Sequence, residues 1–115
     1  MIVGIGVDII EISRIQKALE RWGDDFLKHI LTDEEILHAR KYKFPVPHYA
    51  GRFAAKEAVF KALGDKNVSW KDLNISNDAQ GKPYCVYRNK DFANQILLSI
   101  SHSKDYAVAQ AIVTK

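Results

Sequence analysis

The pattern of hydrophobic and polar residues predicts that the chain begins with a strand and continues into a helix. Residues 2–10 are rich in isoleucine and valine, and side chains in a strand alternate between its two faces. One face carries Asp8 together with Gly4 and Gly6. Over residues 11–22 the apolar side chains recur at intervals of three and four residues, which predicts a helix.

Two more helices are expected before residue 65. Thr32 and Glu35 form a capping box, which predicts a helix of about ten residues through Lys43, ending in a basic run. Two prolines then indicate a loop and a new helix start. The segment HYAGRFAAKEAVFKALG, residues 48–64, is predicted as this helix, with a glycine at its end.

The rest of the chain is typical of β-structure. Its last predicted strand alternates larger residues with Ala107, Ala109 and Ala111, and this small face permits close packing of a helix or a neighbouring subunit. The order of strand, helices and hairpins predicts an α+β fold for one small domain, residues 1–115. The predicted elements of this part are strands 74–77 and 84–88, a short helix at 92–95, and hairpin strands 96–102 and 106–113.

Composition narrows the classes of function. A net charge of +3 and a pI near 9.0 suit an acidic partner or a phosphate-bearing ligand, but are weak support for nucleic acid. Cys85 is the only cysteine, which excludes a disulfide framework and a CxxC metal site and favours a reducing cytoplasm. The apolar start lacks the marks of a signal peptide, and no stretch approaches the ~20 apolar residues of a membrane span.

Two carboxylates lie in apolar surroundings. Asp8 interrupts the first strand, where it either caps the following helix or belongs to a site. The two glycines on its face either clear room beside the carboxylate or let another backbone or a ligand approach closely. Glu57 lies within the apolar stripe of the helix 48–64, where Lys61 one turn on, or a metal ion, would compensate its charge.

Oxygen ligands are those that Mg²⁺ prefers, and Mg²⁺ commonly takes one or two carboxylates plus substrate phosphates. With basic residues such as Arg52 nearby in sequence, the pattern favours a metal-assisted site for a diphosphate-bearing substrate. The four histidines lack zinc-ligand spacing, and neither a GxxxxGK[ST] nor a GxGxxG phosphate loop is present.

Arg14, Lys17 and Arg21 form a cationic stripe along the first predicted helix. Such a stripe is usually a solvated face, but an unbroken one also suits an acidic docking partner. Trp22 and Phe26 beside it either join the core or add an apolar contact to this surface.

Four segments in order carry a family resemblance: GIGVDIIEISRI, GRFAAKEAVFKALG, GKP and SISHSKDYAVAQA, at residues 4–15, 51–64, 81–83 and 99–111. Over nearly its whole length the chain resembles the short, bacterial-type holo-[acyl-carrier-protein] synthases, which are 4′-phosphopantetheinyl transferases. The resemblance implies transfer of 4′-phosphopantetheine from coenzyme A to a serine of apo-acyl carrier protein, releasing adenosine 3′,5′-bisphosphate, in support of fatty acid biosynthesis in the cytoplasm.

The resemblance also assigns roles to residues. It implies that Asp8 and Glu57 bind Mg²⁺ and that Lys61 lies near the phosphates, so these three form the catalytic set. The serine proton would go either to Glu57 through a metal-bound water or to Lys61. Arg52 and His102 join Lys61 as expected coenzyme A contacts, although His102 also suits a purely structural role. The basic run 40–43 either meets the 3′-phosphate of coenzyme A or is a solvated helix end.

The family docks acyl carrier protein through the first helix, which gives Arg14, Lys17 and Arg21 a partner-binding role. Its short members assemble as homotrimers with active sites between subunits, and the resemblance suggests that the face of Ala107, Ala109 and Ala111 is buried against neighbours. No nucleic acid or membrane partner is expected. A small RNA-binding module would explain the pI and the aromatic residues near lysines, and an adaptor for an acidic protein would explain the stripe, but neither explains Asp8 and Glu57.

Overall fold

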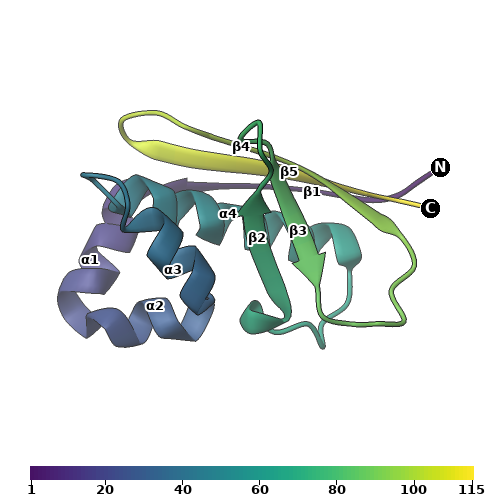
Figure 1. The fold of residues 1–115 in the computed structure, drawn as a ribbon, viewed down its shortest axis with the longest axis horizontal. Coiled ribbons are helices and arrows are strands. Elements are labelled where there is room, and N and C mark those ends of the chain that lie inside the picture. The colour runs from purple at the N-terminus through teal and green to yellow at the C-terminus, as the bar shows by residue number, and fades with distance from the viewer.

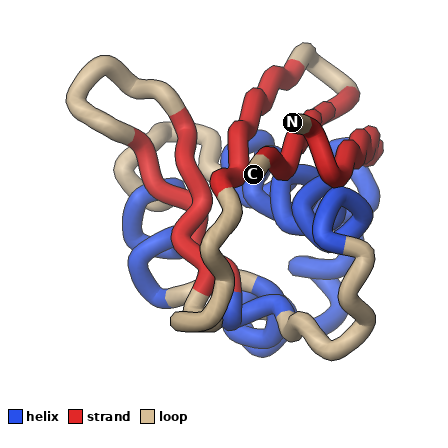
Figure 2. Tube along the Cα trace, turned by 90° about the vertical axis from the view of Figure 1, so that its right-hand side faces the viewer, coloured by secondary structure: helices blue, strands red, loops and turns tan.

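One long helix, α4, lies between two antiparallel sheets in the computed structural model, which describes residues 1–115 (Figures 1 and 2). Three shorter helices gather beside the first part of α4, and both chain termini lie at one end of the larger sheet. In chain order the elements are β1 (Ile2–Glu11), α1 (Ile12–Trp22), α2 (Asp24–Ile30), α3 (Asp33–Ala39), α4 (Val46–Leu63), a 3₁₀ turn (Trp70–Asp72), β2 (Leu73–Asn77), β3 (Pro83–Tyr87), β4 (Gln95–His102) and β5 (Tyr106–Thr114). The predicted α+β class is confirmed.

The larger sheet has the strand order β1-β5-β4, and β2 pairs with β3 in the smaller one. In the larger sheet Asp8 lies opposite Ala109, which in turn lies opposite Ile100 of β4. The alanines of β5 are buried within the chain, where the sheet packs on α4. The expectation that this face is buried against neighbouring subunits is therefore wrong: it accommodates a helix of the same chain.

Two glycines of β1 let α4 lie close to the sheet. A Cβ atom on Gly4 would come within 1.9 Å of the carbonyl oxygen of Ala62, and one on Gly6 within 2.0 Å of that of Ala58. No side chain can occupy these positions without moving the helix backbone. The glycines thus explain why the second half of α4 lies directly against β1, and why residues of that half reach Asp8.

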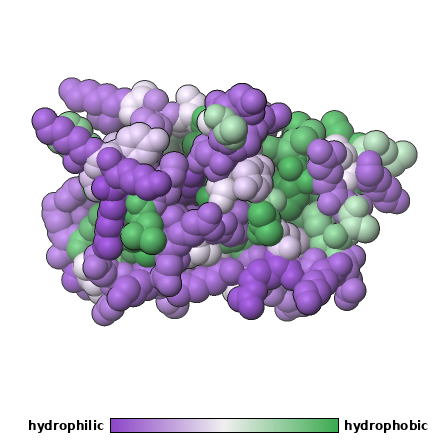
Figure 3. Space-filling view, viewed as in Figure 1, coloured by the Kyte–Doolittle hydropathy of each residue, from purple (hydrophilic) through white to green (hydrophobic).

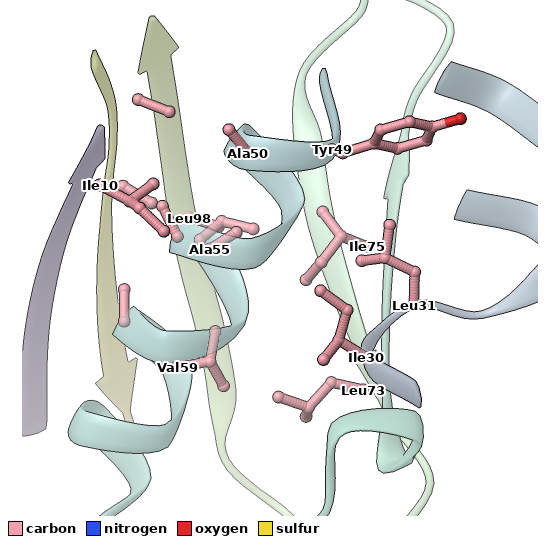
Figure 4. Close-up of a cluster of buried hydrophobic side chains, with 14 of the residues drawn as sticks. Ile10, Ile30, Leu31, Tyr49, Ala50, Ala55, Val59, Leu73, Ile75 and Leu98 are labelled. Atoms are coloured by element: carbon pink, nitrogen blue, oxygen red, sulfur yellow. The ribbon is translucent and has the colours of Figure 1, made fainter. Parts of the chain in front are cut away.

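The main core extends to both sides of α4 (Figure 4). Ile10 and Leu98 lie on the side of the larger sheet, and Ile30, Leu73 and Ile75 lie on the side of α2 and the smaller sheet. Every one of these side chains is at most 8% exposed. Because α4 is covered on both sides, it contains many small residues, and its backbone serves as the framework that the sheets share.

A buried ion pair joins the helices to the smaller sheet. Lys56 Nζ lies 2.7 Å from Glu35 Oε1, both side chains are fully buried, and the ammonium also donates to the backbone oxygens of Ile30 and Trp70. Glu35 accepts hydrogen bonds from the backbone N–H groups of Thr32 and Ile75. Each charge therefore has the additional partners that a buried ion pair needs.

The structure corrects several predicted boundaries. The helix α3 ends at Ala39 rather than at Lys43, because Lys41 and Tyr42 donate to carbonyl groups three residues earlier and tighten the chain into turns before Pro45. The long helix begins at Val46 rather than at residue 48, with Pro47 in its first turn, where a missing N–H costs nothing.

The segment 92–95 is not helical, and α2 was not expected. Phe92 packs its ring 5.1 Å from that of Tyr87, the chain then extends, and β4 begins at Gln95. The α2 helix has seven residues and begins with Asp24 and Asp25, whose charges are favourable at a helix N-terminus. The capping box at Thr32 and Glu35 and the helix end at Gly23 are confirmed.

The face of β1 that points away from α4 is apolar and exposed. Val3, Ile5, Val7 and Ile9 are 46–64% exposed. Figure 3 shows hydrophobic surface gathered at the end of the molecule where both termini lie. No helix of the fold has the length and apolar character needed to cross a membrane.

Candidate functional site

The site is built where β1 crosses the second half of α4. Asp8 lies on the β1 face that carries the two glycines, and Lys61 reaches it from the last turns of α4. Lys61 Nζ lies 3.3 Å from Asp8 Oδ1 and donates a hydrogen bond of 2.9 Å to the carbonyl oxygen of Val7. Asp8 therefore does not cap the following helix, whose N-cap residue is Glu11 without a side-chain hydrogen bond.

Glu57 lies one helical turn before Lys61 and is partly buried. Burial raises the pKa of its carboxyl group above the ordinary value, the charge of Asp8 raises it further, and Lys61 acts in the opposite direction. The ammonium of Lys61 forms its ion pair with Asp8 rather than with Glu57. Two carboxylates are thus near enough to repel each other, and one cation compensates only part of that charge.

These two carboxylates suit Mg²⁺ better than a metal held by protein ligands alone. The structure contains no group of three or more His, Cys, Asp or Glu side chains able to hold a metal ion. Mg²⁺ needs only one or two carboxylates when substrate phosphates and water complete its ligands. The raised pKa of Glu57 is the observation that carries this fit, since a cation placed here would relieve the repulsion from Asp8.

A cluster of cationic side chains lies on another side of α4 from the site of Asp8, Glu57 and Lys61. Arg52 and Glu57 are five residues apart, which corresponds to about 140° of rotation around the helix. Arg52 is 8% exposed, its Nη2 group donates to Asn77 of β2, and its Nε atom is buried without a partner. It contributes to a cleft of about 580 Å³ that is also lined by His38, Arg40 and Lys41.

The cleft is also lined by one carboxylate, Glu34, whose oxygens accept hydrogen bonds from Asn74 and Ser76. Cations outnumber it, so the cleft has the chemistry of an anion site. An unpaired buried N–H of a guanidinium group is costly unless a ligand accepts its hydrogen bond. Two residues of the basic run 40–43, Arg40 and Lys41, add positive charge at its edge. His102 is exposed at the end of β4 and does not line the cleft; its ring contacts that of His48 from the first turn of α4.

Arg14, Lys17 and Arg21 border one groove of about 370 Å³ along α1. Trp22 is 56% exposed, and the guanidinium of Arg21 lies 4.8 Å from the centre of its ring. Trp22 thus belongs to this surface rather than to the core, whereas Phe26 is partly buried against the core and also lines the groove. The apolar part of the groove consists of Ile10, Ile15, Ala18, Trp22, Phe26 and Phe53.

The structure brings Asp8, Glu57 and Lys61 together. It places Arg52 in the cleft around α4, and His102 at the end of β4, two strands from β1 in the same sheet. Sequence reasoning missed Tyr42 and His48, which connect the cleft with His102 through ring contacts. The signal for them is weak, because the two residues belong to the turn and the helix start on either side of Pro45. Whether their two rings meet depends on how the chain turns at Pro45.

Comparisons with known proteins show the family of the chain. The family model of the 4′-phosphopantetheinyl transferase superfamily matches residues 4–111. Holo-[acyl-carrier-protein] synthase from Protochlamydia amoebophila is 47% identical to the chain, covering 97% of it and 98% of the relative. The enzyme of that name from a Geobacillus species is 48% identical and covers 100% and 98%.

Solved structures agree as well. Holo-(acyl-carrier-protein) synthase from Bacillus anthracis in complex with CoA (3′,5′-ADP) gives a TM-score of 0.88 at 45% identity, covering 100% of this chain and 98% of that one. The Helicobacter pylori enzyme in complex with coenzyme A gives 0.87 at 32% identity, covering 96% and 99%. The chain belongs to the 4′-phosphopantetheinyl transferase superfamily, and within it to the holo-[acyl-carrier-protein] synthases.

Proposed function

We propose that the chain, as one domain over residues 1–115, transfers 4′-phosphopantetheine from coenzyme A to a serine of apo-acyl carrier protein. The observation that carries the proposal is the meeting of Asp8, Glu57 and Lys61 between β1 and α4. The names of its relatives and the coenzyme A bound to similar structures support it. Acyl carrier proteins serve fatty acid biosynthesis, and we propose that role for this enzyme too.

The reaction makes and breaks one bond at phosphorus. The serine oxygen bonds to the phosphorus nearer the pantetheine, the bond from that phosphorus to the bridging oxygen breaks, and adenosine 3′,5′-bisphosphate leaves. Such transfers need charge neutralisation and in-line positioning more than covalent help from the protein. Asp8 and Glu57 would hold Mg²⁺, which when bound supplies that neutralisation at the diphosphate.

The structure favours different roles for Glu57 and Lys61. Lys61 is held by the carboxylate of Asp8 and the carbonyl of Val7, contacts that stabilise a positive charge, so we assign it as a fixed charge for a phosphate oxygen. Glu57 makes no ion pair with Lys61, so its carboxylate oxygens can accept a hydrogen bond from water. We therefore propose Glu57 as the base that receives the serine proton through a water molecule.

The nucleotide end of coenzyme A would meet the cluster of cationic side chains. Arg52, the basic run 40–43 and His102 are the groups proposed for its 3′-phosphate and ribose. Arg52 lies around α4 from the catalytic carboxylates, which supports a donor site completed by two copies of the chain. The exposed apolar face of β1 supports assembly as a homotrimer through the outer side of the larger sheet.

The acidic carrier protein would dock on α1. The groove there combines the three cations with an apolar surface that includes Trp22. Complementary charge speeds and orients encounter, while apolar contact at the centre supplies affinity. We propose a cytoplasmic location, with which the partly buried free thiol of Cys85 is consistent.

Mass spectrometry of apo-acyl carrier protein tests the function. Incubation with the purified chain, coenzyme A and Mg²⁺ should add the mass of one phosphopantetheine group, and a carrier protein whose acceptor serine is replaced by alanine should gain nothing. Glu57→Gln is the matched enzyme control. A carrier protein left unmodified by the wild-type chain would overturn the proposal and leave the adaptor or the RNA-binding module as the better explanation.

A further inference from the structure

Four aromatic rings form a continuous row beside the cationic cleft. The row consists of His38, Tyr42, His48 and His102. The ring of His38 meets that of Tyr42 edge-on, with 5.7 Å between the ring centres. Tyr42 stacks on His48 with 3.6 Å between the centres and 16° between the planes. His48 in turn meets His102 edge-on, with 5.3 Å between the centres. The two edge-on contacts have the geometry that aromatic pairs favour, and the pair of Tyr42 and His48 is a close face-to-face stack. The row joins α3, the turn after it, the first turn of α4 and the end of β4.

His102 is the member with the least support from its own strand. It is exposed, it is the last residue of β4, and the hairpin turn 103–105 follows it. A side chain in that position samples several rotamers unless a neighbour selects one. His48 is that neighbour, and it is fixed in turn by its stack on Tyr42.

The chemical state of His48 agrees with a packing role. Burial lowers the pKa of its imidazole, and the positive charge of His102, Arg52 and His38 lowers it further, so that the neutral ring is favoured at neutral pH. A neutral ring adds no charge of its own to the cleft. Its contribution must then come from shape, through the faces and edges that it presents to Tyr42 and His102.

We propose that Tyr42 and His48 are positioning residues, which hold the imidazole of His102 in the orientation that meets the nucleotide end of coenzyme A. The inference rests on the proposed function, in which His102 contacts that donor. The alternative is that the row only packs the turn 40–45 against α4. These two roles differ in one respect. Only a positioning role requires that His48 change the affinity for coenzyme A through His102.

Calorimetric titration of coenzyme A into the assembled enzyme, together with transfer kinetics, tests the inference. His48→Ala should raise the Kd for coenzyme A by about two- to tenfold, the range expected from one aromatic pair, with kcat at saturating donor unchanged. His48→Phe keeps a flat ring against His102 and should stay within about twofold of wild type. Tyr42→Ala removes the stack from an exposed turn and provides a second variant should His48→Ala fail to fold. His29→Ala removes an exposed histidine of α2 outside the row and should change nothing.

A double-mutant cycle supplies the decisive comparison. If His48 acts through His102, then His48→Ala should have no further effect on the Kd in a His102→Ala background. An equal penalty in both backgrounds, or a His48→Ala enzyme that binds as wild type does, overturns the inference while transfer by the wild type leaves the proposed function intact. A wild-type chain that neither binds coenzyme A nor transfers overturns both.

An NMR measurement without any ligand tests the contact itself. The Cε1–H resonance of His102 should shift in His48→Ala and Tyr42→Ala toward the position of a free histidine, and should remain near its wild-type position in His48→Phe and His29→Ala. An unchanged His102 resonance in His48→Ala would show that His48 does not hold this ring, and would overturn the inference independently of activity.

Discussion

Glu57 carries a charge that its surroundings disfavour. Burial and the nearby carboxylate of Asp8 both raise the pKa of its carboxyl group. A group whose ionised form is disfavoured in the folded protein lowers stability whenever it is charged. The most direct reason for a fold to keep such a group is a ligand that reverses the penalty, and here that ligand would be a cation.

Replacement of Glu57 by glutamine should separate catalysis from stability. We expect transfer to fall by more than about a hundredfold, since the loss of even an outer-shell partner of a metal costs 10–100-fold. Without metal the variant should be as stable as wild type or slightly more so, because an unfavourable charge has gone. Unfolding in denaturant with EDTA and the transfer assay measure the two effects on the same preparation.

Asp8→Asn is the comparison for this test. It should also lose transfer, but it removes the partner of Lys61 and should cost up to about 1 kcal/mol of stability, as exposed ion pairs do. A Glu57→Gln enzyme with full transfer in Mg²⁺ would exclude Glu57 from the site. One that is much less stable would show that the carboxylate has a structural role instead.

At this scale the sequence points to the candidate residues but does not predict how they pair. Asp8 and Glu57 are recognisable because each interrupts an apolar pattern. That Lys61 pairs with Asp8, rather than with Glu57 one turn away on the same helix, depends on the distance between β1 and α4. That distance follows from a contact between glycine and helix backbone, which no local pattern describes.

At the scale of elements, the contact of β1 with α4 depends on two positions without a side chain. Gly4→Ala should destabilise the protein by at least about 2 kcal/mol, because the new methyl group meets a backbone oxygen that can move only with the helix. Transfer should fall as well, since the shift separates Asp8 from α4. Thermal unfolding and the transfer assay measure both.

Gly64→Ala is the matched control for the glycine prediction. Gly64 ends α4 with φ of 68°, and a Cβ there would meet nothing within 4 Å. The substitution therefore adds only the strain of a left-handed conformation, about 1 kcal/mol. Equal losses of stability in Gly4→Ala and Gly64→Ala would mean that the close approach of α4 does not prevent a side chain at position 4 of β1.

The buried ion pair of Lys56 and Glu35 also holds α4 in place, on the side of the smaller sheet. Lys56→Met should cost about 3–5 kcal/mol, because it leaves the charge of Glu35 buried without its partner. The double variant Lys56→Met with Glu35→Leu should be less destabilised than the sum of the single variants, since no lone charge remains. Denaturant unfolding of the four proteins gives the coupling energy. A coupling near zero would show that water or other groups compensate each charge separately.

The sequence predicts the long elements better than the short ones. The strand β1 has ten residues and the helix α4 has eighteen, with Pro47 in its first turn and Gly64 at its end. The helix α2 has only seven residues, and its helical structure depends on packing of Leu27 and Ile30. The expected helix at 92–95 is absent because Phe92 packs on Tyr87 instead of continuing a helical turn. In both cases tertiary contacts decide a segment too short to form by itself.

For the whole molecule, the distribution of charge predicts how the partner approaches. Arg14→Glu with Arg21→Glu should raise the KM for acyl carrier protein at least about tenfold at low salt, mainly by slowing association. The effect should shrink as salt reduces the range of the charges to about 10 Å at 0.1 M. The Kd for coenzyme A should hardly change, because its proposed contacts lie away from the groove.

Reversing two charges elsewhere is the control for the docking prediction. Lys66→Glu with Lys90→Glu changes the net charge by the same amount in exposed loops outside the groove. A carrier-protein KM that rises equally in both double variants would indicate a general effect of net charge. One that stays at the wild-type value in the α1 variant would show that the stripe is only a solvated face.

Assembly is the property of the whole molecule that the exposed face of β1 predicts. Buried alanines on the inner face of the larger sheet leave only its outer face for a neighbour, and Ile5 and Ile9 there are 61% and 64% exposed. Monomers rarely expose apolar patches of this kind. We therefore expect a homotrimer in solution, in which each coenzyme A contacts the carboxylates of one subunit and the cationic cluster of another.

Ile5→Glu with Ile9→Glu should convert the trimer into a folded monomer. Both side chains point away from α4, so the core of the single chain keeps its contacts and circular dichroism should be unchanged. Light scattering should show the loss of assembly, and transfer should fall with it because the two clusters are no longer joined. Val86→Glu, which places a charge on an exposed apolar position of β3, should leave the trimer intact. A monomer that transfers at the wild-type rate would require the whole donor site to lie within one chain, and would overturn a site shared between two copies.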